Sequence, residues 1–170
     1  IAIQRGNVGL AAQAYADLAK RTRDPRLARR ATELAVFARM TAIATESARI
    51  WLDSDPGSAR ALQSLAGLLI ASARLDEALP LLRQMLATRS ADIGDAFTQL
   101  SRTLGAVQDK AAALRVAQQL AKEYPRVPAA GLAVARAALA AKDEALALQQ
   151  IAQVRSLQPE SEQAVLLEAQ

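Results

Sequence analysis

Apolar residues recur at helical spacing along the chain, most clearly in residues 59–90. Two stripes there follow a period of 3.6 residues: Leu62, Leu65, Leu69 and Ile70 in the first half, and Ala78, Leu81, Leu82 and Met85 in the second. A short polar break separates the halves, and Ser58 is placed to cap the first helix. The pattern predicts a helical hairpin that stacks on similar hairpins.

The same periodicity predicts helices on both sides of this hairpin. The expected helices cover residues 1–5, 8–23, 26–38, 41–53, 92–104, 109–123, 127–140, 144–156 and the start of a further one at 160–170. Pro80 falls in or next to the first turn of its helix if that helix starts at Asp76 or Glu77. Because the first-turn N–H groups have no intrahelical partner, we expect little kink there.

The helical pairs repeat. A small residue early in each second helix recurs with spacings of 33, 34, 35 and 34, at Ala11, Ala44, Ala78, Ala113 and Ala147. Seven residues later each pair has a large apolar residue: Leu18, Trp51, Met85, Leu120 and Val154. A period near 34 with two helices per unit is typical of an α-helical repeat protein.

Several short segments strengthen this interpretation. Leu65-Ala66, Leu100-Ser101 and Val134-Ala135 fill one place in successive first helices, and Gly6-Asn7 stands at an expected turn, whereas Arg39-Met40 lacks the turn glycine. In these features the chain resembles the tetratricopeptide repeat (TPR) family. The resemblance implies an all-α, right-handed α-solenoid of about five helix-turn-helix units, forming one domain over 1–170 that is a fragment of a longer chain. The expected units are 1–24, 25–58, 59–92, 93–127, 128–161 and the start of a sixth at 162–170.

Composition agrees with a helical fold and narrows the chemistry. Of 170 residues, 52% are hydrophobic but only 3% are aromatic, which favours helices over sheets. Without histidine or cysteine, the chain has no histidine base, thiol nucleophile or usual zinc ligand set. No apolar run approaches the roughly 20 residues of a membrane-spanning helix. We expect no cofactor, no metal and no small-molecule substrate.

The acidic pairs of the sequence have a structural explanation. Asp76-Glu77 and Asp143-Glu144 each open an expected helix, where negative charge interacts favourably with the helix dipole. Trp51 lies at a core position of its unit. These features favour capping and packing over acid catalysis, so we interpret the chain as a non-enzyme.

In the TPR family the first helices line the concave face, and the resemblance therefore implies a set of ligand-binding residues. They are Arg26, Arg29, Glu33, Phe37, Arg60, Gln63, Gly67, Ile70, Asp95, Thr98, Arg102, Leu132 and Arg136. Arginine donates a planar fork of hydrogen bonds suited to carboxylates and carbonyls. A solvated face without a partner is the alternative for any single arginine. The residue set with which some family members grip the carboxylate ends of chaperones is not reproduced, because Glu33 stands where asparagine is needed.

Basic residues crowd one corner of the predicted fold. Residues 1–90 hold 13 Lys+Arg against 8 Asp+Glu, and residues 91–170 hold 8 against 9. The patch comprises Lys20, Arg21, Arg23, Arg26, Arg29 and Arg30. Only Tyr15 and Phe37 are near to stack on bases, so an acidic protein fits better than RNA. A solvated helix end without a partner fits better than either.

Together these features predict a scaffold that binds a peptide or protein, including an acidic one, on its concave face. The alternatives are a helical accessory domain of a larger enzyme and a nucleic-acid binder. Val165, Leu166 and Leu167 would be uncovered on a terminal helix, which predicts self-association or a docked partner there. The segment Arg21-Thr22-Arg23-Asp24-Pro25 is followed by an alanine- and arginine-rich helix and by a second helix ending Ile50-Trp51-Leu52. This stretch resembles repeat adaptors and lipoproteins of proteobacterial cell envelopes, which implies the periplasm or envelope, with the cytoplasm as the alternative.

Overall fold

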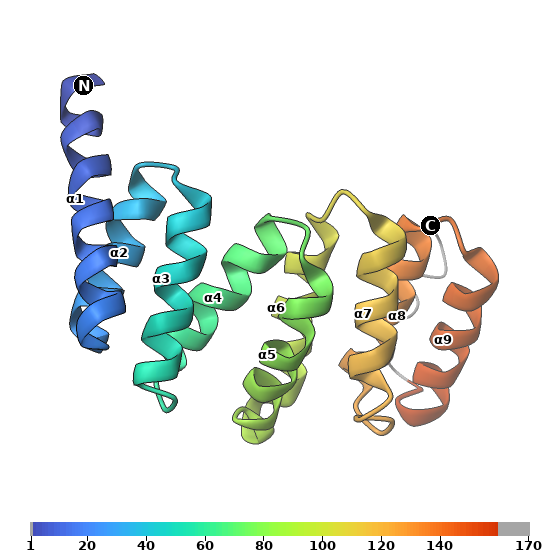
Figure 1. Cartoon of the computed structure of the whole chain (residues 1–170). Helices are drawn as coiled ribbons and strands as arrows, with labels where there is room; N and C mark the ends of the chain where they lie inside the picture. Colours follow the sequence, from blue (N-terminus) through green and yellow to red (C-terminus); the bar gives the residue numbers. More distant parts are fainter. Residues whose placement is uncertain (1, 160–170) are drawn as a thin grey trace. The chain divides into compact units, whose positions relative to one another are not determined.

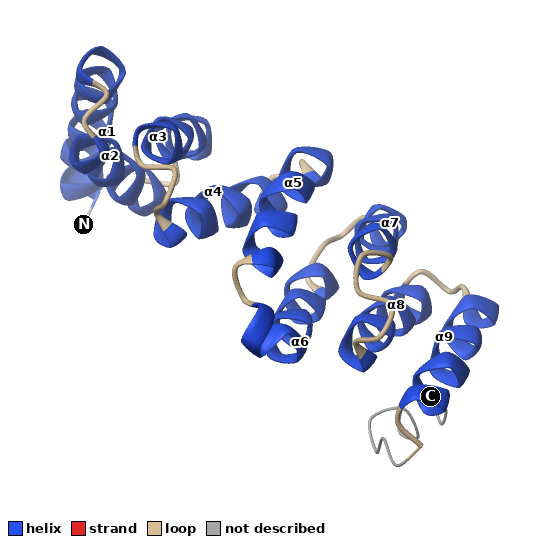
Figure 2. Ribbon diagram, turned by 90° about the horizontal axis from the view of Figure 1, so that it is seen from below, coloured by secondary structure: helices blue, strands red, loops and turns tan. Residues whose placement is uncertain are grey.

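The computed structural model describes residues 2–159, with side chains from residue 7 onward, and this part of the chain is all-α, as predicted (Figures 1 and 2). Its helices are α1 Ala2–Thr22, α2 Pro25–Phe37, α3 Thr41–Ser54, α4 Ala59–Ala71, α5 Leu75–Ala87, α6 Ile93–Gly105, α7 Lys110–Ala121, α8 Pro128–Ala140 and α9 Glu144–Leu157. A single 3-10 turn, Ser90–Asp92, leads into α6.

The helices form two compact units, Ile1–Arg74 and Leu75–Gln170. In the first unit, α1 packs against α2 and α3, and α3 packs against both α2 and α4. In the second unit, α6 contacts α5, α7 and α8. Helix α7 also packs against α5 and α8, and α9 packs on α8. In the first unit α3 thus joins α2 and α4, and in the second unit the first helices α6 and α8 pack side by side.

Side-chain caps fix where several helices begin. The Ser58 hydroxyl accepts a hydrogen bond of 3.2 Å from the backbone N–H of Ala61, which confirms the predicted cap of α4. Carboxylates of Asp24, Asp109 and Asp143 accept equivalent bonds of 2.8, 2.9 and 3.1 Å at α2, α7 and α9. Each bond satisfies an N–H that the helix itself cannot pair.

Three turns between paired helices use the same left-handed residue without glycine. Arg39, Ala73 and Lys142 have φ angles of 59°, 56° and 63°. In each turn the next residue donates its N–H to a carbonyl five positions back, at 2.8, 2.8 and 2.9 Å. This hydrogen bond closes the helix end, and it explains how the turn at Arg39-Met40 forms although the family's glycine is missing.

The small and large residues that mark the repeat lie in the core from the second helical pair onward. Four of the small markers are buried, namely Ala44, Ala78, Ala113 and Ala147. Trp51, Leu120 and Val154 are buried seven residues after their markers, and the whole stripe from Leu62 to Ile70 is buried as well. Met85 is only partly buried, because Leu86 takes the core position beside it.

The expectations for the first repeat are wrong. α1 runs unbroken through Gly6-Asn7, where a turn was expected. A glycine costs a helix only about 1 kcal/mol, which the helix-forming neighbours outweigh. Leu18 is 44% exposed, while Ala12 and Ala19 are buried. Alanine at the contact lets α1 approach α2 and α3 closely, so the buried register lies one residue later than the predicted one.

Two further expectations concern particular segments. α5 begins at Leu75, one residue before the predicted start, so Pro80 lies in the second turn, and the helix continues through it to Ala87. The expected helix at residues 160–170, with Val165, Leu166 and Leu167 uncovered, lies outside the described residues.

Candidate functional site

The first unit has a groove of about 730 Å³ between α2 and α4, with α3 contributing to its wall. Its lining comprises Thr32, Glu33, Val36, Phe37, Trp51, Arg60, Gln63, Ser64, Gly67 and Leu68. Five of these residues were predicted ligand contacts: Glu33, Phe37, Arg60, Gln63 and Gly67. The groove therefore joins predicted residues from two successive first helices.

The groove combines exposed apolar side chains with unoccupied space above one glycine. Phe37 is 66% exposed and Val36 is 52% exposed, so the lining holds two large apolar side chains that face solvent. A Cβ atom placed on Gly67 would meet no atom of another element within 4 Å, so glycine leaves space there. Arg60, Gln63 and Ser64 add polar groups along α4. Such a surface can accept apolar side chains and hydrogen-bond a neighbouring backbone.

Glu33 is the one carboxylate on the groove lining, and α2 itself compensates its charge. The Arg29 Nε donates to its Oε1 at 2.8 Å, and Arg30 approaches its Oε2 at 3.4 Å. The Arg29 guanidinium holds the pKa of the Glu33 carboxyl below its ordinary value, with Arg30 adding to the effect. Arg29 is therefore engaged within its own helix.

Most of the predicted basic patch is likewise paired with carboxylates. Arg26 binds Asp24 at 2.8 Å and lowers the pKa of that carboxyl. Lys20 reaches Glu46 at 3.0 Å, and Arg23 lies 4.0 Å from Asp53, both acids belonging to α3. The corner is thus a mixed surface of both charges, which favours the interpretation as a solvated helix end.

The second unit has a smaller pocket, of about 190 Å³, between the end of α6, the start of α7 and the middle of α8. Arg102 and Arg136, both predicted ligand contacts, line it together with Lys110. The rest of the lining is Ser101, Leu104, Gly105, Ala113, Ala133, Ala137 and Ala140. The lining thus holds three basic residues and four alanines.

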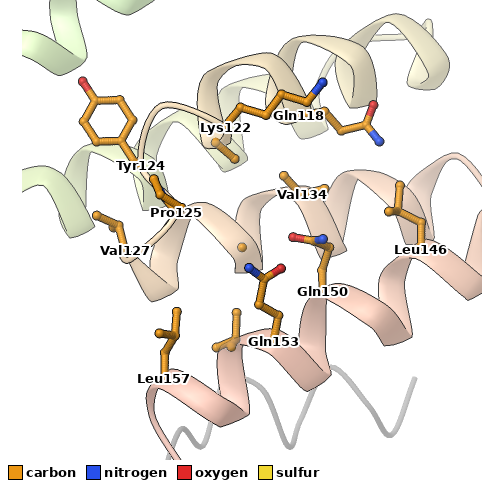
Figure 3. A pocket seen from close by; sticks show the side chains of 13 residues that line it. Gln118, Lys122, Tyr124, Pro125, Val127, Val134, Leu146, Gln150, Gln153 and Leu157 are labelled. Carbon is orange, nitrogen blue, oxygen red and sulfur yellow. The ribbon is translucent and has the colours of Figure 1, made fainter.

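A third hollow, of about 380 Å³, lies over α8 between α7 and α9 (Figure 3). Gln118 of α7 and Lys122, which follows the end of α7, lie across from Gln150 and Gln153 of α9. Gly131 forms part of its floor, and a Cβ there would fall 2.6 Å from the Val154 Cγ2. Glycine at this position is therefore needed for the close packing of α8 on α9.

The remaining predicted contacts lie elsewhere. Ile70 is 9% exposed and Leu132 is 6% exposed, so both are core residues of their units and offer a ligand little surface. Arg26, Arg29, Asp95 and Thr98 line neither the groove nor the cationic pocket. Sequence reasoning missed Val36, whose exposure on the groove is visible only once α2 is packed, and Lys110, which follows a turn.

Comparison with known proteins gives similarity of fold. No family model matches the sequence, and no curated protein matches it either. Among solved structures, YrrB, described as a TPR protein with an unusual peptide-binding site, is 16% identical, with a TM-score of 0.52 over 97% of this chain and 85% of that chain. The chain has a TPR-like fold. MamA 41-end from Desulfovibrio magneticus RS-1 is 16% identical, with a TM-score of 0.51 over 94% and 90% of the two chains. A further MamA structure is 15% identical, with a TM-score of 0.52 over 92% and 86%.

Two other kinds of site were sought in the part of the chain that the structure describes. None of its helices combines the length and apolar character needed to cross a membrane. Within residues 2–159 no three of the acidic side chains gather in a way that could hold a metal ion.

Proposed function

We propose that this chain is a non-enzymatic scaffold that binds a peptide or protein segment in the groove between α2 and α4. The observation that supports this most directly is the exposed pair Val36 and Phe37 beside the open surface at Gly67. An apolar strip of this kind on a helical repeat is a docking surface rather than a core. The TPR-like fold supports a peptide or protein as the partner.

The polar groups of the groove favour an extended segment. Gln63 and Ser64 on α4 carry both donors and acceptors, and the Arg60 guanidinium carries donors only. These groups can pair with backbone carbonyls and N–H groups of a ligand while Phe37 contacts its side chains. Gly67 lets the ligand backbone approach α4 closely.

A nucleic-acid ligand receives less support, because the basic corner is paired with Asp24, Glu33, Glu46 and Asp53. Neutralised arginines and lysines release fewer counterions on binding a phosphate backbone. Weak, salt-insensitive binding of the chain to single-stranded RNA would agree with this conclusion.

The experiment is a selection of random peptides displayed on phage against the immobilised chain. Each selected peptide is then synthesised and titrated against variants. Gly67→Leu should fill the groove without disturbing the core, and Phe37→Ala should remove the exposed ring. Losing the burial of one large apolar side chain should weaken binding about tenfold or more.

Leu148→Ala is the matched control, because Leu148 is a 54% exposed leucine of α9 that lies outside the groove. Peptides should bind this variant as they bind the wild type. If the selected peptides bind Gly67→Leu and Phe37→Ala unchanged, the ligand site lies elsewhere and the proposal fails.

The more specific form of this proposal is a cell-envelope adaptor, and it rests on the resemblance of residues 21–25 and the two helices that follow them, the second ending at Ile50-Trp51-Leu52. Fractionation of the native cells, followed by detection of the protein with an antibody, tests it. A protein confined to the cytoplasm would leave the scaffold proposal intact and remove the envelope one.

A further inference from the structure

We propose that the hollow over α8 binds an uncharged, extended peptide segment through the glutamine amides on its two walls. These amides belong to Gln118 of α7 and to Gln150 and Gln153 of α9. The site goes beyond the groove between the first helices α2 and α4, because it lies wholly within the second unit and its walls are second helices of the repeat.

The hollow lies where other second helices pack on each other. Helix α1 packs against α3, and an ion pair joins Lys20 to Glu46 there. Helix α5 packs against α7, and Arg83 pairs with Glu123, which follows α7. In contrast, α7 and α9 each pack on α8 and leave a volume of about 380 Å³ between them. This volume falls within the roughly 300–1,000 Å³ of sites that take a ligand.

The glutamine amides of the hollow have no partner of their own. None of the side-chain amides of Gln118, Gln150 and Gln153 forms a hydrogen bond within the part of the chain that the structure describes. Gln150 lies near the floor, since a Cβ atom on Gly131 would come 3.9 Å from its Oε1. Figure 3 shows Gln118 on the opposite wall. Each amide carries two N–H donors and a carbonyl acceptor, so both walls can bind a ligand.

An extended backbone matches these amides better than a helix does. The N–H and C=O groups of a helix bind each other, whereas those of an extended chain stay free and point alternately to its two sides. A segment between α7 and α9 can therefore pair with glutamines on both walls. Val127 and Leu146 are partly buried and Leu157 is 45% exposed, so the lining also offers apolar surface to small side chains.

The lining favours an uncharged ligand over a nucleotide or an acidic segment. It holds no carboxylate and a single cation, Lys122, which is exposed. Tyr124 is the aromatic residue of the lining, but its ring meets Phe97 edge-on and turns away from the glutamines (Figure 3). A nucleobase would therefore find no ring on which to stack. Backbone amides need neither a charge nor a ring.

The test uses short blocked peptides on the full chain. N-acetyl-Ala-Val-Ala-amide is uncharged, and three analogues of it each replace one backbone N–H by an ester oxygen. N-acetyl-Ala-Glu-Ala-amide adds a carboxylate. Each compound is titrated while the side-chain Nε2–Hε2 signals of the glutamines are followed by NMR.

We expect the neutral peptide to shift the signals of Gln118, Gln150 and Gln153. At least one ester should bind about threefold to tenfold more weakly, because it cannot donate a backbone hydrogen bond. Equal binding of the peptide and all three esters would overturn the proposal, and so would the absence of any shift. Binding of the acidic peptide tenfold tighter than that of the neutral one would also overturn it and would indicate recognition of charge by Lys122.

Variants locate the response. Gln150→Met combined with Gln153→Met removes both amides of α9 at nearly constant side-chain length and should weaken binding about tenfold. Gln149→Met is the matched control, because Gln149 is an exposed glutamine of the same helix outside the lining, and binding should stay unchanged. Circular dichroism checks that each variant is folded, and the ester series tests the wild-type chain independently of the variants.

Gly67→Leu should also leave the response unchanged, so failure of the groove between α2 and α4 and failure of this hollow are separate results. Binding that survives the double glutamine substitution would contradict the assignment.

Discussion

The two units differ at one and the same position of the repeat. Glu33, Gly67, Arg102 and Arg136 follow one another with spacings of 34, 35 and 34. In the first unit this position holds Glu33, whose carboxylate is paired with two arginines, and then Gly67, which lies on an open surface. Glu33 and Gly67 both line the apolar groove. In the second unit it gives two arginines on one cationic pocket.

This difference teaches that the number of cations is a poor guide to an anion site. The first unit holds the crowded basic residues, yet α3 and α2 supply acids that neutralise most of them. The second unit is less basic in sequence, but its two pocket arginines are left without an acid among the described residues. Pairing in space decides which cations are available to a ligand.

The largest expected effect tests whether the second unit depends on its own core. Phe97 is fully buried, and its ring meets that of Tyr124 edge-on at a centroid distance of 5.3 Å. Phe97→Ala should lower the free energy of unfolding by about 3–5 kcal/mol, because it removes the buried ring and leaves a cavity. Urea denaturation followed by circular dichroism measures the loss.

Leu148→Ala is again the control, and it should change stability by less than about 0.5 kcal/mol because Leu148 is exposed. A loss for Phe97→Ala no larger than that of the control would mean that the ring is not part of a packed core.

The sequence predicted the architecture because packing repeats. Ala44, Ala78, Ala113 and Ala147 are all buried, and their regular spacing is visible without a structure. The first repeat departed from this pattern, since α1 continues through Gly6-Asn7 and buries Ala12 and Ala19 instead. Helix propensity alone could not show that, because one glycine is a weak stop signal.

The candidate site could be predicted only in part. Periodicity placed Glu33, Phe37, Arg60 and Gly67 on one type of helix, and the groove joins them. Periodicity also placed Ile70 on the apolar stripe of its helix, and this side chain turns into the core. The ion pairs of Lys20 with Glu46 and Arg23 with Asp53 are also invisible in sequence, because they join residues on different helices.

Two glycines provide the next test, with effects of opposite sign. Gly131→Ala should lower the free energy of unfolding, since overpacking against Val154 costs about 1–3 kcal/mol and outweighs the gain in helix propensity. Gly67→Ala should raise it by about 0.5–1 kcal/mol, because its Cβ enters open space within a helix. The two unfolding curves measure both changes. A loss of stability at Gly67 would show that its surface is not open.

The smallest effect concerns the paired Glu33, whose folded pKa lies below the ordinary value of 4.5 because Arg29 and Arg30 bind the carboxylate. The stability that this pairing contributes is complete above pH 4.5 and is lost as the pH falls through the lower folded pKa. Since the side chain is 43% exposed, the pairing should contribute only about 0.2–1 kcal/mol to the free energy of unfolding.

Urea unfolding at several pH values between about 3 and 7 measures this contribution. The free energy of unfolding should fall less steeply with decreasing pH for Glu33→Gln than for the wild type. Added salt should narrow the difference, because it screens exposed charges. Identical acid profiles for the two proteins would show that Glu33 is unpaired in solution, and the first unit would then offer free arginines as the second one does.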